Sequence, residues 1–579
     1  MNRRQFNCVA LGLAVAAAGA DAALARDAGL SAAGLFDRLE GFGFSGGAFI
    51  VEAGRPVFKR SCGWADRALG EPFRFDTPFN IASVTKPLTA LTVLKLAEEG
   101  ALAPQDPLGR FLPAAPADKA KLTLAQLMSH SSGLPRSVPM DDTVDRDALL
   151  QRILEVELIA APGARFAYSN IGYCLLAAVI ETVTGGTYRE AVRRRIFEPA
   201  GMIRSGFEQD YRTTRPVAHG YDEWKDVGAF PTTHRRGWFD GPGNIVSTLG
   251  DMVRLTQAIE TGRLVSARSL ASAMIAHSPS TEDDGYDSYG YGWYLGKALD
   301  GSPLSAHSGD SVGYHSELRW YPQARRWIYL VATKELYDSS GFGLGVHARV
   351  ISNDLERLRT GAPVKAPPAL RPGGRRVLDS LVGDFPSQDG AGRISVLRRD
   401  PRDPALTAFA VGQRAADALS GADAVGASEN AAANARALAL ADLIRAEDGA
   451  GLKAALGSRD FFAAGWVETF RAWREAHGSF VGFGPLTSRH TPFGDPQIRT
   501  FAPFRFERGE EVLEFTWAGT TLFETLTGRG LPSPVIAPVA PVVGEGFATY
   551  DMVTRKALPI TLDGADLLVG GVRFGPRAG

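Results

Sequence analysis

Phe79-Asn80-Ile81-Ala82-Ser83-Val84-Thr85-Lys86 opens a long apolar segment whose helical periodicity predicts a helix over 83–99. Gly100 follows in the position expected of a helix C-terminal cap. Ser83 and Lys86 stand three residues apart, so they share one face of the predicted helix at its N-terminal end. The sequence therefore places a hydroxyl and an amine next to each other where a helix begins.

The elements predicted around this helix are strands at both ends of a domain with helices between them. A helix over 31–41 and strands over 47–52 and 56–62 come first, and strands over 289–296, 313–321 and 327–333 precede a last helix over 343–358. The intervening helices are predicted over 122–129, 147–156, 170–184, 187–197, 248–260 and 267–276. This order predicts an α+β fold of the α/β-sandwich type, in which distant segments close one mixed or antiparallel sheet and a helical region is inserted.

A proline- and glycine-rich linker over 360–374 ends this first domain, which we place at 28–359. The remaining residues, 375–579, contain an alanine-rich helical stretch over 431–456 and a second helix over 461–477. Strands follow over 479–486, 499–507, 511–517 and 520–526, and a proline-rich spacer over 531–541 precedes a short terminal strand pair. Helices followed by strands predict a smaller α+β accessory domain at the C-terminus.

Three motifs could carry chemistry together. A serine hydroxyl is a poor nucleophile at neutral pH, and Lys86, one helical turn away, can serve as its base if burial lowers the lysine pKa. Tyr168-Ser169-Asn170 precedes a predicted helix and offers a tyrosine to relay protons and an asparagine to orient Lys86 and the substrate. His307-Ser308-Gly309 lies on a predicted strand, where glycine allows close approach to a substrate and backbone N–H groups can stabilise an oxyanion.

In this order the three motifs resemble those of the serine β-lactamase and penicillin-binding-protein superfamily, most closely class C β-lactamases and the related esterases and D-amino-acid peptidases. Phrases that extend the resemblance over 40–358 are Gly63-Trp64-Ala65-Asp66, His130-Ser131-Ser132-Gly133-Leu134, Gly243-Asn244-Ile245 and Tyr289-Gly290-Tyr291-Gly292. The resemblance implies a β-lactamase-like fold for 28–359 and an exported serine hydrolase that uses no metal or cofactor. The site roles it implies are Ser83 as acylated nucleophile, Lys86 and Tyr168 as general bases, Asn170, His307 and Gly309 as substrate-binding residues, and the N–H groups of Ser83 and Asp310 as oxyanion hole.

The third motif departs from the pattern of typical β-lactamases, which begin it with lysine where this chain has His307. With an ordinary pKa of about 6.5, this histidine would be mostly uncharged at about pH 7.5, which argues against strong β-lactam hydrolysis. We expect small esters or D-amino-acid peptides as substrates, and a gain of carboxylate-bearing substrates over neutral esters as the pH falls from about 8 to about 6. The alternatives are a weak β-lactamase or DD-peptidase, and a catalytically retired protein that binds peptidoglycan peptides.

Composition and the N-terminus bear on partners and compartment. The 579 residues include 63 Lys+Arg and 64 Asp+Glu, so the basic excess typical of nucleic-acid-binding proteins is missing. Arg3 and Arg4 precede an apolar run too short to span a bilayer and then a small-residue cleavage pattern. This predicts a twin-arginine signal peptide over 1–25 and a periplasmic or secreted protein without stable membrane insertion. Cys62 and Cys174 would remain in the exported chain, either as two buried thiols or as a disulfide.

Overall fold

The computed structural model describes residues 30–138, 146–211, 216–222, 225–230, 239–279, 286–311, 313–333, 345–371, 378–388, 393–398, 405–411, 418, 427–456, 462–484, 486–491, 497–518, 521–527, 536–543, 546–550 and 557–576. The chain folds as two compact units, the first ending at Ala366 and the second starting at Pro367. Each unit has buried apolar clusters of its own.

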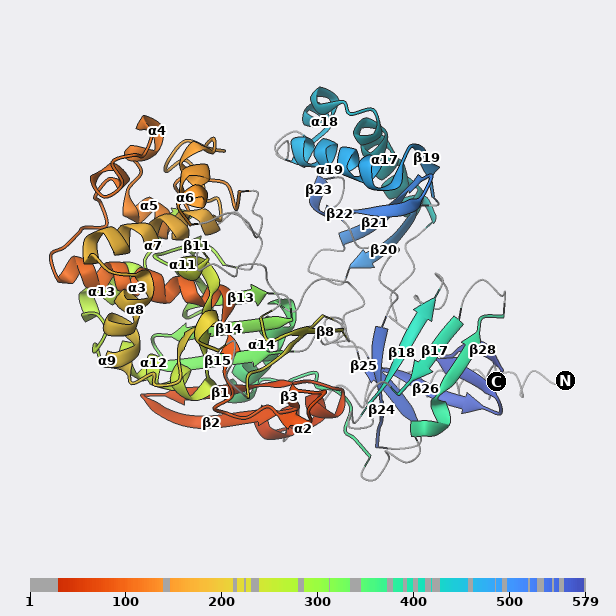
Figure 1. Ribbon diagram of the computed structural model, residues 1–579. Coiled ribbons are helices and arrows are strands. Elements are labelled where there is room, and N and C mark those ends of the chain that lie inside the picture. The colour runs from red at the N-terminus through yellow and green to blue at the C-terminus, as the bar shows by residue number, and fades with distance from the viewer. Residues whose placement is uncertain are drawn as a thin grey trace. The chain divides into compact units, whose positions relative to one another are not determined.

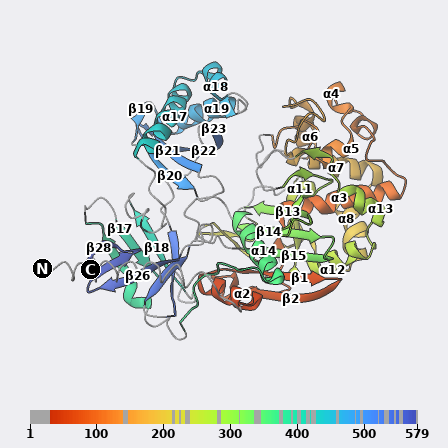
Figure 2. The same cartoon turned by 180° about the vertical axis from the view of Figure 1, so that it is seen from behind.

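An eight-stranded sheet lies at the centre of the first unit. Its strands are β1 (Gly46–Glu52), β2 (Arg55–Cys62), β10 (Ser278–Pro279), β11 (Ser288–Tyr289), β12 (Tyr294–Lys297), β13 (Pro303–Ser311), β14 (Tyr314–Tyr321) and β15 (Arg326–Ala332). They run in the order β10-β11-β12-β13-β14-β15-β1-β2, and every described pair is antiparallel. The predicted closure by distant segments is confirmed, because β1 pairs with β15, the two lying side by side in red and green (Figures 1 and 2). The strand predicted over 289–296 is instead two short strands, since the chain turns at Gly292 with φ of 81°.

Side chains of β14 alternate between the two faces of this sheet. Tyr321 points to one face, where its hydroxyl donates to Glu356 of helix α14 (Gly345–Thr360) at 2.8 Å. Ser316 points to the opposite face, where its hydroxyl donates to the Ile81 carbonyl at 3.0 Å. The sheet therefore has α14 on one side and the segment leading into Ser83 on the other.

Helices inserted between β2 and β10 complete the first unit. The longer ones, with α2 preceding β1, are α2 (Ala32–Gly41), α3 (Thr85–Glu98), α5 (Leu124–Met128), α6 (Arg146–Glu155), α7 (Asn170–Thr184), α8 (Tyr188–Val192), α12 (Leu249–Glu260) and α13 (Ala267–Ala273). Shorter elements are β3 (Trp64–Asp66), β4 (Glu71–Pro72), β5 (Phe79–Asn80), η1 (Ala82–Val84), η2 (Leu108–Arg110), α4 (Ala117–Ala120), η3 (Arg193–Phe197), α9 (Glu198–Ala200), β6 (Gly206–Phe207), α10 (Glu208–Tyr211), β7 (Gly220–Asp222), β8 (Lys225–Gly228), α11 (Asp240–Gly243) and β9 (Ile245–Ser247). Helix α7 has the predicted bounds because Ser169 caps its start and Gly185, with φ of 67°, ends it.

Two predicted helices of this unit differ in detail. The helix predicted over 83–99 begins as the single 3₁₀ turn η1 and becomes α-helical at Thr85, so Ser83 lies in the 3₁₀ turn. The helix predicted over 187–197 is α8 followed by the π-helical turn η3 and then α9.

The second unit contains an eight-stranded antiparallel sheet around an apolar core. Its strands are β16 (Gly383–Pro386), β17 (Arg393–Leu397), β18 (Leu406–Val411), β24 (Ile536–Pro541), β25 (Phe547–Tyr550), β26 (Ala557–Asp563), β27 (Asp566–Val569) and β28 (Val572–Pro576), with η4 (Asp379–Leu381) before them. They are paired in that order, and a bridge between Ser387 and Phe574 joins the two edges, which closes the sheet on itself. The spacer predicted over 531–541 is wrong in its second half: Ile536–Pro541 is a strand, because Val539 buries against this core despite the prolines. The predicted terminal strand pair is likewise four strands, β25 to β28.

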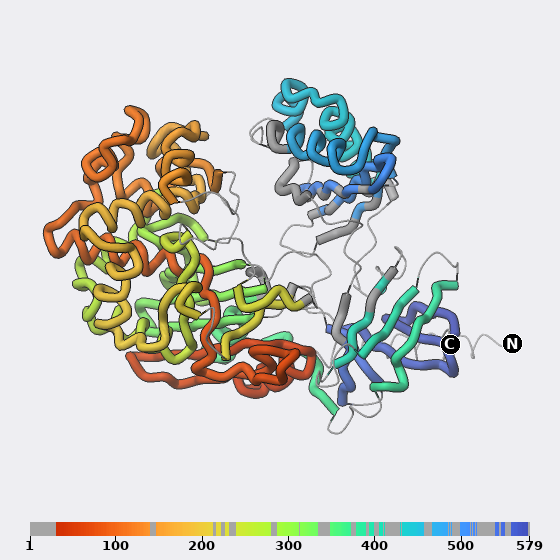
Figure 3. Tube along the Cα trace, in the orientation of Figure 1, coloured from red at the N-terminus to blue at the C-terminus, as the bar shows by residue number. Residues whose placement is uncertain are grey.

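The second unit also contains a group of helices and strands that is inserted between β18 and β24 along the chain (Figure 3). Its elements are α17 (Ala427–Arg445), α18 (Gly449–Leu456), α19 (Phe462–His477), β19 (Phe480–Phe483), β20 (Thr487–Thr491), β21 (Gln497–Phe506), β22 (Gly509–Ala518) and β23 (Thr521–Thr527). The single helix predicted over 431–456 is two helices, because the chain turns at Glu447, whose φ is 55°. The α+β class predicted for the C-terminal region is confirmed, although it is built around two cores rather than one.

Cys62 and Cys174 are both buried and both free, so no disulfide joins them. Burial raises the pKa of the Cys174 thiol to about 12, which keeps it neutral. Among the described residues no single helix is long and apolar enough to cross a membrane, and only α7 taken with Tyr188–Ala200, a pair bent by 80°, reaches that length and composition. The predicted signal peptide over 1–25 lies outside the described residues.

Candidate active site

The turn that carries Ser83 is held at several backbone atoms. Asn80 Oδ1 accepts a hydrogen bond from Ala82 N at 2.5 Å, which supports Ala82 in a left-handed conformation with φ of 45°. Ile81 N donates to the Ile245 carbonyl of β9 at 3.0 Å, and the Ile81 carbonyl accepts from Ser316 of β14. A non-glycine residue with positive φ costs conformational energy, which the surrounding contacts must offset. The turn is therefore fixed by contacts from both sides before any substrate binds.

Ser83, Lys86 and Tyr168 meet at the start of α3. Lys86 Nζ lies 2.9 Å from Ser83 Oγ and donates a second hydrogen bond to the Pro242 carbonyl at 3.0 Å. The Tyr168 hydroxyl donates to Ser83 Oγ at 3.1 Å, and Lys86 Nζ lies 4.9 Å from the centre of the Tyr168 ring. The three predicted groups are thus within hydrogen-bond reach of one oxygen.

Lys86 is fully buried, and this decides its protonation. Burial lowers the pKa of Lys86 well below its usual value, and the guanidinium of Arg136 lowers it further. A lysine with a lowered pKa has a neutral amine available to accept a proton at pH values where an exposed lysine is charged.

The segment before α7 is held by the loop that starts at His130. Ala167 N donates to the His130 carbonyl at 2.7 Å, and Ser169 N donates to His130 Nδ1 at 3.0 Å. The His130 and Tyr168 rings lie 4.3 Å apart between centroids. Since Nδ1 accepts a hydrogen bond and burial lowers the His130 pKa well below 6.5, the imidazole is the neutral Nε2–H tautomer. His130 therefore holds both chain neighbours of Tyr168 by hydrogen bonds and packs its ring against the Tyr168 ring.

Asn170 contacts a different partner from the one predicted. Its backbone N donates to the Arg136 carbonyl at 2.9 Å, while its side-chain Oδ1 is buried and has no hydrogen-bond partner among the described residues. The hydrogen-bond partners of Lys86 are Ser83 and Pro242, and no bond joins it to Asn170 in the part of the chain that the structure describes. The free Oδ1 can instead accept a hydrogen bond from a substrate N–H group.

His307 differs most from the expectation of a partly charged histidine. It is 1% exposed, and burial, with a contribution from Lys86, lowers its pKa to about 3. Its Nδ1 lies 2.6 Å from the Ser308 carbonyl and its Nε2 lies 2.9 Å from the Tyr289 hydroxyl. A carbonyl only accepts, so Nδ1 carries the proton and Nε2 accepts from Tyr289. The expected titration of His307 between about pH 8 and 6 is therefore wrong, because the expectation used the pKa of an exposed imidazole.

Gly309 brings strand β13 against the Ser83 turn. A Cβ at this position would overlap the Ile81 carbonyl and lie 3.1 Å from Ser83 N, so only glycine permits this approach. Asp310 follows on the strand, and its half-exposed carboxylate accepts a hydrogen bond from His315 Nδ1 at 2.7 Å. The backbone at 309–310 thus passes beside the Ser83 N–H, where the resemblance places an oxyanion hole.

One cluster outside these motifs has metal-binding residue types. Asp66, His219 and Asp226 offer ligand atoms that all lie within 4.8 Å of one another. His219 Nδ1 is 2.9 Å from Asp226, so an imidazole–carboxylate contact already accounts for the arrangement.

The sequence motifs omitted the contacts that hold these side chains. The Pro242 carbonyl binds Lys86, but a backbone acceptor has no signature in the residue type. The His130 ring packs on Tyr168, but from the sequence His130 resembles a turn residue. The phrases around Gly243 and His130 that extended the resemblance were the available signals.

Comparisons with known proteins agree on one family. A family model described as Beta-lactamase matches residues 36–348. Penicillin-binding protein 4* of Bacillus subtilis is 27% identical over 62% of this chain and 82% of its own length, and esterase EstB of Burkholderia gladioli is 28% identical over 47% and 79%. The structure of an octameric penicillin-binding protein homologue from Pyrococcus abyssi is similar in fold, with 20% identity and a TM-score of 0.50 over 83% of this chain and 98% of that one.

Proposed function

The chain belongs to the beta-lactamase family, and from that premise we propose that it is a serine hydrolase that cleaves a small ester or amide through an acyl-enzyme on Ser83. One observation carries the proposal: Ser83 Oγ lies 2.9 Å from the buried amine of Lys86 and 3.1 Å from the Tyr168 hydroxyl. A serine with a neutral amine and a phenol in contact has both the base and the proton relay that nucleophilic catalysis needs.

In the acylation step, Ser83 Oγ attacks the substrate carbonyl while its proton passes to Lys86 Nζ. The tetrahedral intermediate then expels the alcohol or amine, which takes a proton through the Tyr168 hydroxyl, and Ser83 is left as an ester. The oxyanion of the intermediate would receive hydrogen bonds from the N–H groups of Ser83 and Asp310, next to which Gly309 lies without a side chain.

In the deacylation step, the same groups act on water. Water gives a proton to Lys86, directly or relayed through the Tyr168 hydroxyl, and attacks the Ser83 ester, and the serine leaves with a proton returned along the same path. The reaction consumes one water and releases an acid and an alcohol or amine.

The substrate class follows from the charges at the site. His307 is neutral, with both ring nitrogens already in hydrogen bonds, so the third motif offers no cation to a substrate carboxylate. We propose neutral small esters as the preferred substrates, with D-amino-acid peptides and β-lactams, which carry a carboxylate, hydrolysed less readily. The names of the relatives include both an esterase and a penicillin-binding protein, which supports this range.

A covalent probe tests the proposal directly. A fluorescent fluorophosphonate should label the wild-type protein, mass spectrometry should locate the adduct on Ser83, and Ser83→Ala should abolish labelling and turnover together. A panel of p-nitrophenyl esters, D-alanyl peptides and nitrocefin then ranks the substrates. Labelling without turnover of any class would favour a retired peptidoglycan-peptide-binding protein, and an adduct on another serine would contradict the assignment.

We also propose export of the chain by the twin-arginine route, since Arg3 and Arg4 precede a short apolar run. Replacing both arginines by lysine should leave the precursor in the cytoplasm, as fractionation would show.

We propose that residues 28–359 contain the whole reaction machinery and that 375–579 form an accessory part, because all three motifs precede the 360–374 linker. A chain shortened after Ala366 should retain Ser83 labelling, and loss of labelling in soluble shortened protein would contradict this boundary.

A further inference from the structure

The four-residue helix α11 receives two side chains of α3 on its backbone carbonyls. Pro242 O accepts from Lys86 Nζ at 3.0 Å, and Gly241 O accepts from Thr89 Oγ1 at 2.6 Å. Lys86 and Thr89 are three residues apart, so they lie on one helix face. Gly241 also lets α11 lie directly against α7, because a Cβ there would overlap the Tyr173 carbonyl. Helix α11 therefore fixes the face of α3 that carries the proposed base.

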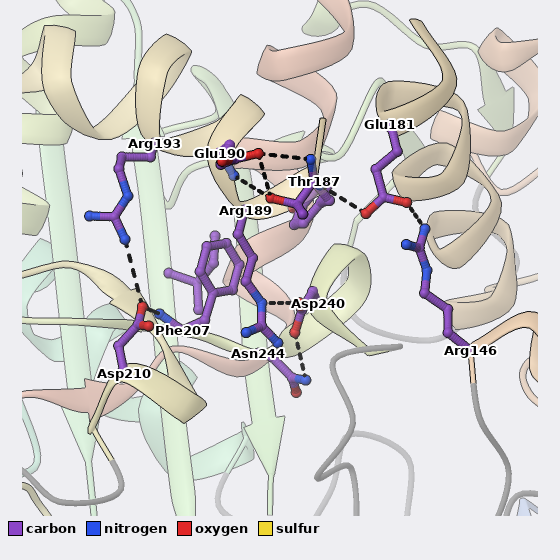
Figure 4. Close-up of polar contacts among 12 residues, drawn as sticks. Arg146, Glu181, Thr187, Arg189, Glu190, Arg193, Phe207, Asp210, Asp240 and Asn244 are labelled. Atoms are coloured by element: carbon purple, nitrogen blue, oxygen red, sulfur yellow. Dashed lines mark hydrogen bonds and ion pairs between the residues drawn. The ribbon is translucent and has the colours of Figure 1, made fainter. Parts of the chain in front are cut away.

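A buried carboxylate holds α11 in turn. Asp240 Oδ2 accepts from Arg189 Nε at 2.6 Å and Oδ1 accepts from Asn244 Nδ2 at 3.1 Å, contacts that Figure 4 shows from α8 and from the end of the turn. The Asp240 side chain is 7% exposed and that of Arg189 is 30% exposed. Hydrogen bonds to a desolvated charge are about twice as strong as neutral ones. The pair is therefore a firm link between α8 and α11.

Tyr188, the neighbour of Arg189, adds a second link from the same helix. Its hydroxyl lies 2.7 Å from Thr89 Oγ1. Thr89 has one hydroxyl proton and gives it to Gly241 O, so Tyr188 is the donor to Thr89. Two parallel connections, one charged and one neutral, thus run from α8 to the turn that receives Lys86.

We propose that Asp240 is a positioning residue of the Ser83 site: paired with Arg189, it fixes the Pro242 carbonyl that receives Lys86 Nζ. This rests on the proposed function, since it assumes that Lys86 is the base. A neutral amine has two protons and one lone pair. With one proton directed to Pro242 O, the amine is restrained so that its lone pair can face Ser83 Oγ, 2.9 Å away.

The charged and titratable groups around these residues determine the expected pH response. Those that face Lys86 are Arg136, Cys174, His130, His307, Tyr168 and Tyr173. Those that face Asp240 are Arg189, Arg146, Cys174 and Tyr188. Burial is the main cause of the lowered Lys86 pKa, the charge that lowers it further is that of Arg136, and Asp240 is not among the causes. If the loss of Asp240 loosens α11, water should therefore reach Lys86, and the Lys86 pKa should rise toward its ordinary value.

The test is the pH dependence of Ser83 labelling by a fluorescent fluorophosphonate in wild type and Asp240→Asn. The rate falls on the acid side where Lys86 becomes protonated. In the variant we expect the midpoint of that fall to rise by about one pH unit, so that labelling on the acid side of the wild-type midpoint drops about tenfold and recovers on the alkaline side. Arg189→Gln, a change at a partly exposed partner, should shift the midpoint in the same direction by less.

A matched control separates positioning from general loss of stability. Asp251 is another buried carboxylate, 2.5 Å from its partner Arg254 in α12, and Asp251→Asn should lower Tm without moving the midpoint. A rate that falls equally at every pH, an unchanged midpoint, or the same shift in the control would overturn the proposal. If Asp240→Asn does not fold, Arg189→Gln decides. Absence of Ser83 labelling in the wild type would instead refute the proposed function.

Discussion

The two sides of Ser83 are built in different ways. On the lysine side, defined by α3 and α11, the amine of Lys86 is held by a backbone carbonyl that a buried ion pair supports. The tyrosine side, defined by the loop from His130 and the start of α7, is a neutral aromatic cluster. Its members are His130, Phe166, Tyr168, Tyr289, Tyr294 and His307.

This difference indicates what each side controls. Contacts on the lysine side keep an amine dry, so disturbing them should change a pKa. Contacts on the tyrosine side are ring packing and backbone hydrogen bonds, so disturbing them should change a position without changing a pKa. Both sides depend on residues far away in sequence: Tyr188 and Asp240 on the lysine side, and Tyr289 on the tyrosine side.

The largest effect is expected from removing the amine itself. Lys86→Met keeps an unbranched apolar side chain in a fully buried position but removes the proposed base, so Ser83 labelling should fall about 10²- to 10⁴-fold. Stability should not fall, because a buried amine is costly to desolvate. Lys95→Met on the same helix, where Lys95 is partly exposed beside Glu98, is the matched control for labelling rate and Tm. Near-normal labelling of Lys86→Met would contradict the role of Lys86 as base and, with it, the proposed difference between the two sides.

A smaller effect is expected from His130 on the tyrosine side. His130→Leu removes the acceptor for Ser169 N–H and the ring against Tyr168, so labelling should fall about tenfold at every pH. His130→Asn retains an acceptor oxygen and tolerates the left-handed backbone, with φ of 56°, so it should lose less.

The rate profile of these two variants against pH is the measurement. His277→Leu removes another histidine that stacks on a tyrosine, Tyr291 at 3.7 Å, and controls for general repacking. A shifted midpoint in His130→Leu would mean that the tyrosine side also sets a pKa.

Sequence reasoning found the elements that have local signals. Helix α7 was predicted with its observed bounds, because Ser169 and Gly185 mark its ends, and the pairing of distant strands followed from the order of elements. The S-x-x-K and Tyr168 motifs placed three groups that do meet at one oxygen.

The same reasoning failed where tertiary contacts overrule local pattern. The prolines of β24 favour a spacer, yet the segment is a strand that pairs with β18, which is distant in sequence, as well as with the adjacent β25. The charge of His307 was misjudged because burial, which no motif reports, lowers its pKa to about 3. The hydrogen bond from Lys86 to the Pro242 carbonyl could not be predicted, since every residue has a backbone carbonyl.

A further prediction concerns Arg136, which contacts the tyrosine side but acts on the lysine side. The Arg136 guanidinium lies 5.0 Å from the centre of the Tyr168 ring, yet it lowers the pKa of Lys86 after burial, the larger cause. In Arg136→Gln the Lys86 pKa should rise, so labelling on the acid side of the wild-type midpoint should fall a few-fold and recover at higher pH. Because Arg136 is exposed, about 0.5 M salt should reduce the difference from wild type. Arg165→Gln, an exposed arginine of the loop before Tyr168, is the control, and a salt-independent loss would contradict an electrostatic role.

The smallest effect is expected from His307, where the structure reverses the expectation drawn from its residue type. With a pKa of about 3, His307 is neutral above that value and becomes charged only as the pH falls through it. At about pH 6 only about a thousandth of the molecules would carry the charge, so the kcat/KM ratio of a carboxylate-bearing substrate to a neutral ester should stay within about twofold from pH 8 to 6. His307→Gln removes the titrating group and should leave that ratio equally flat. A ratio that rises as the pH falls, with a midpoint near 6.5 that disappears in His307→Gln, would show a solvated, charge-reading histidine and a tyrosine side that is not the neutral cluster described above.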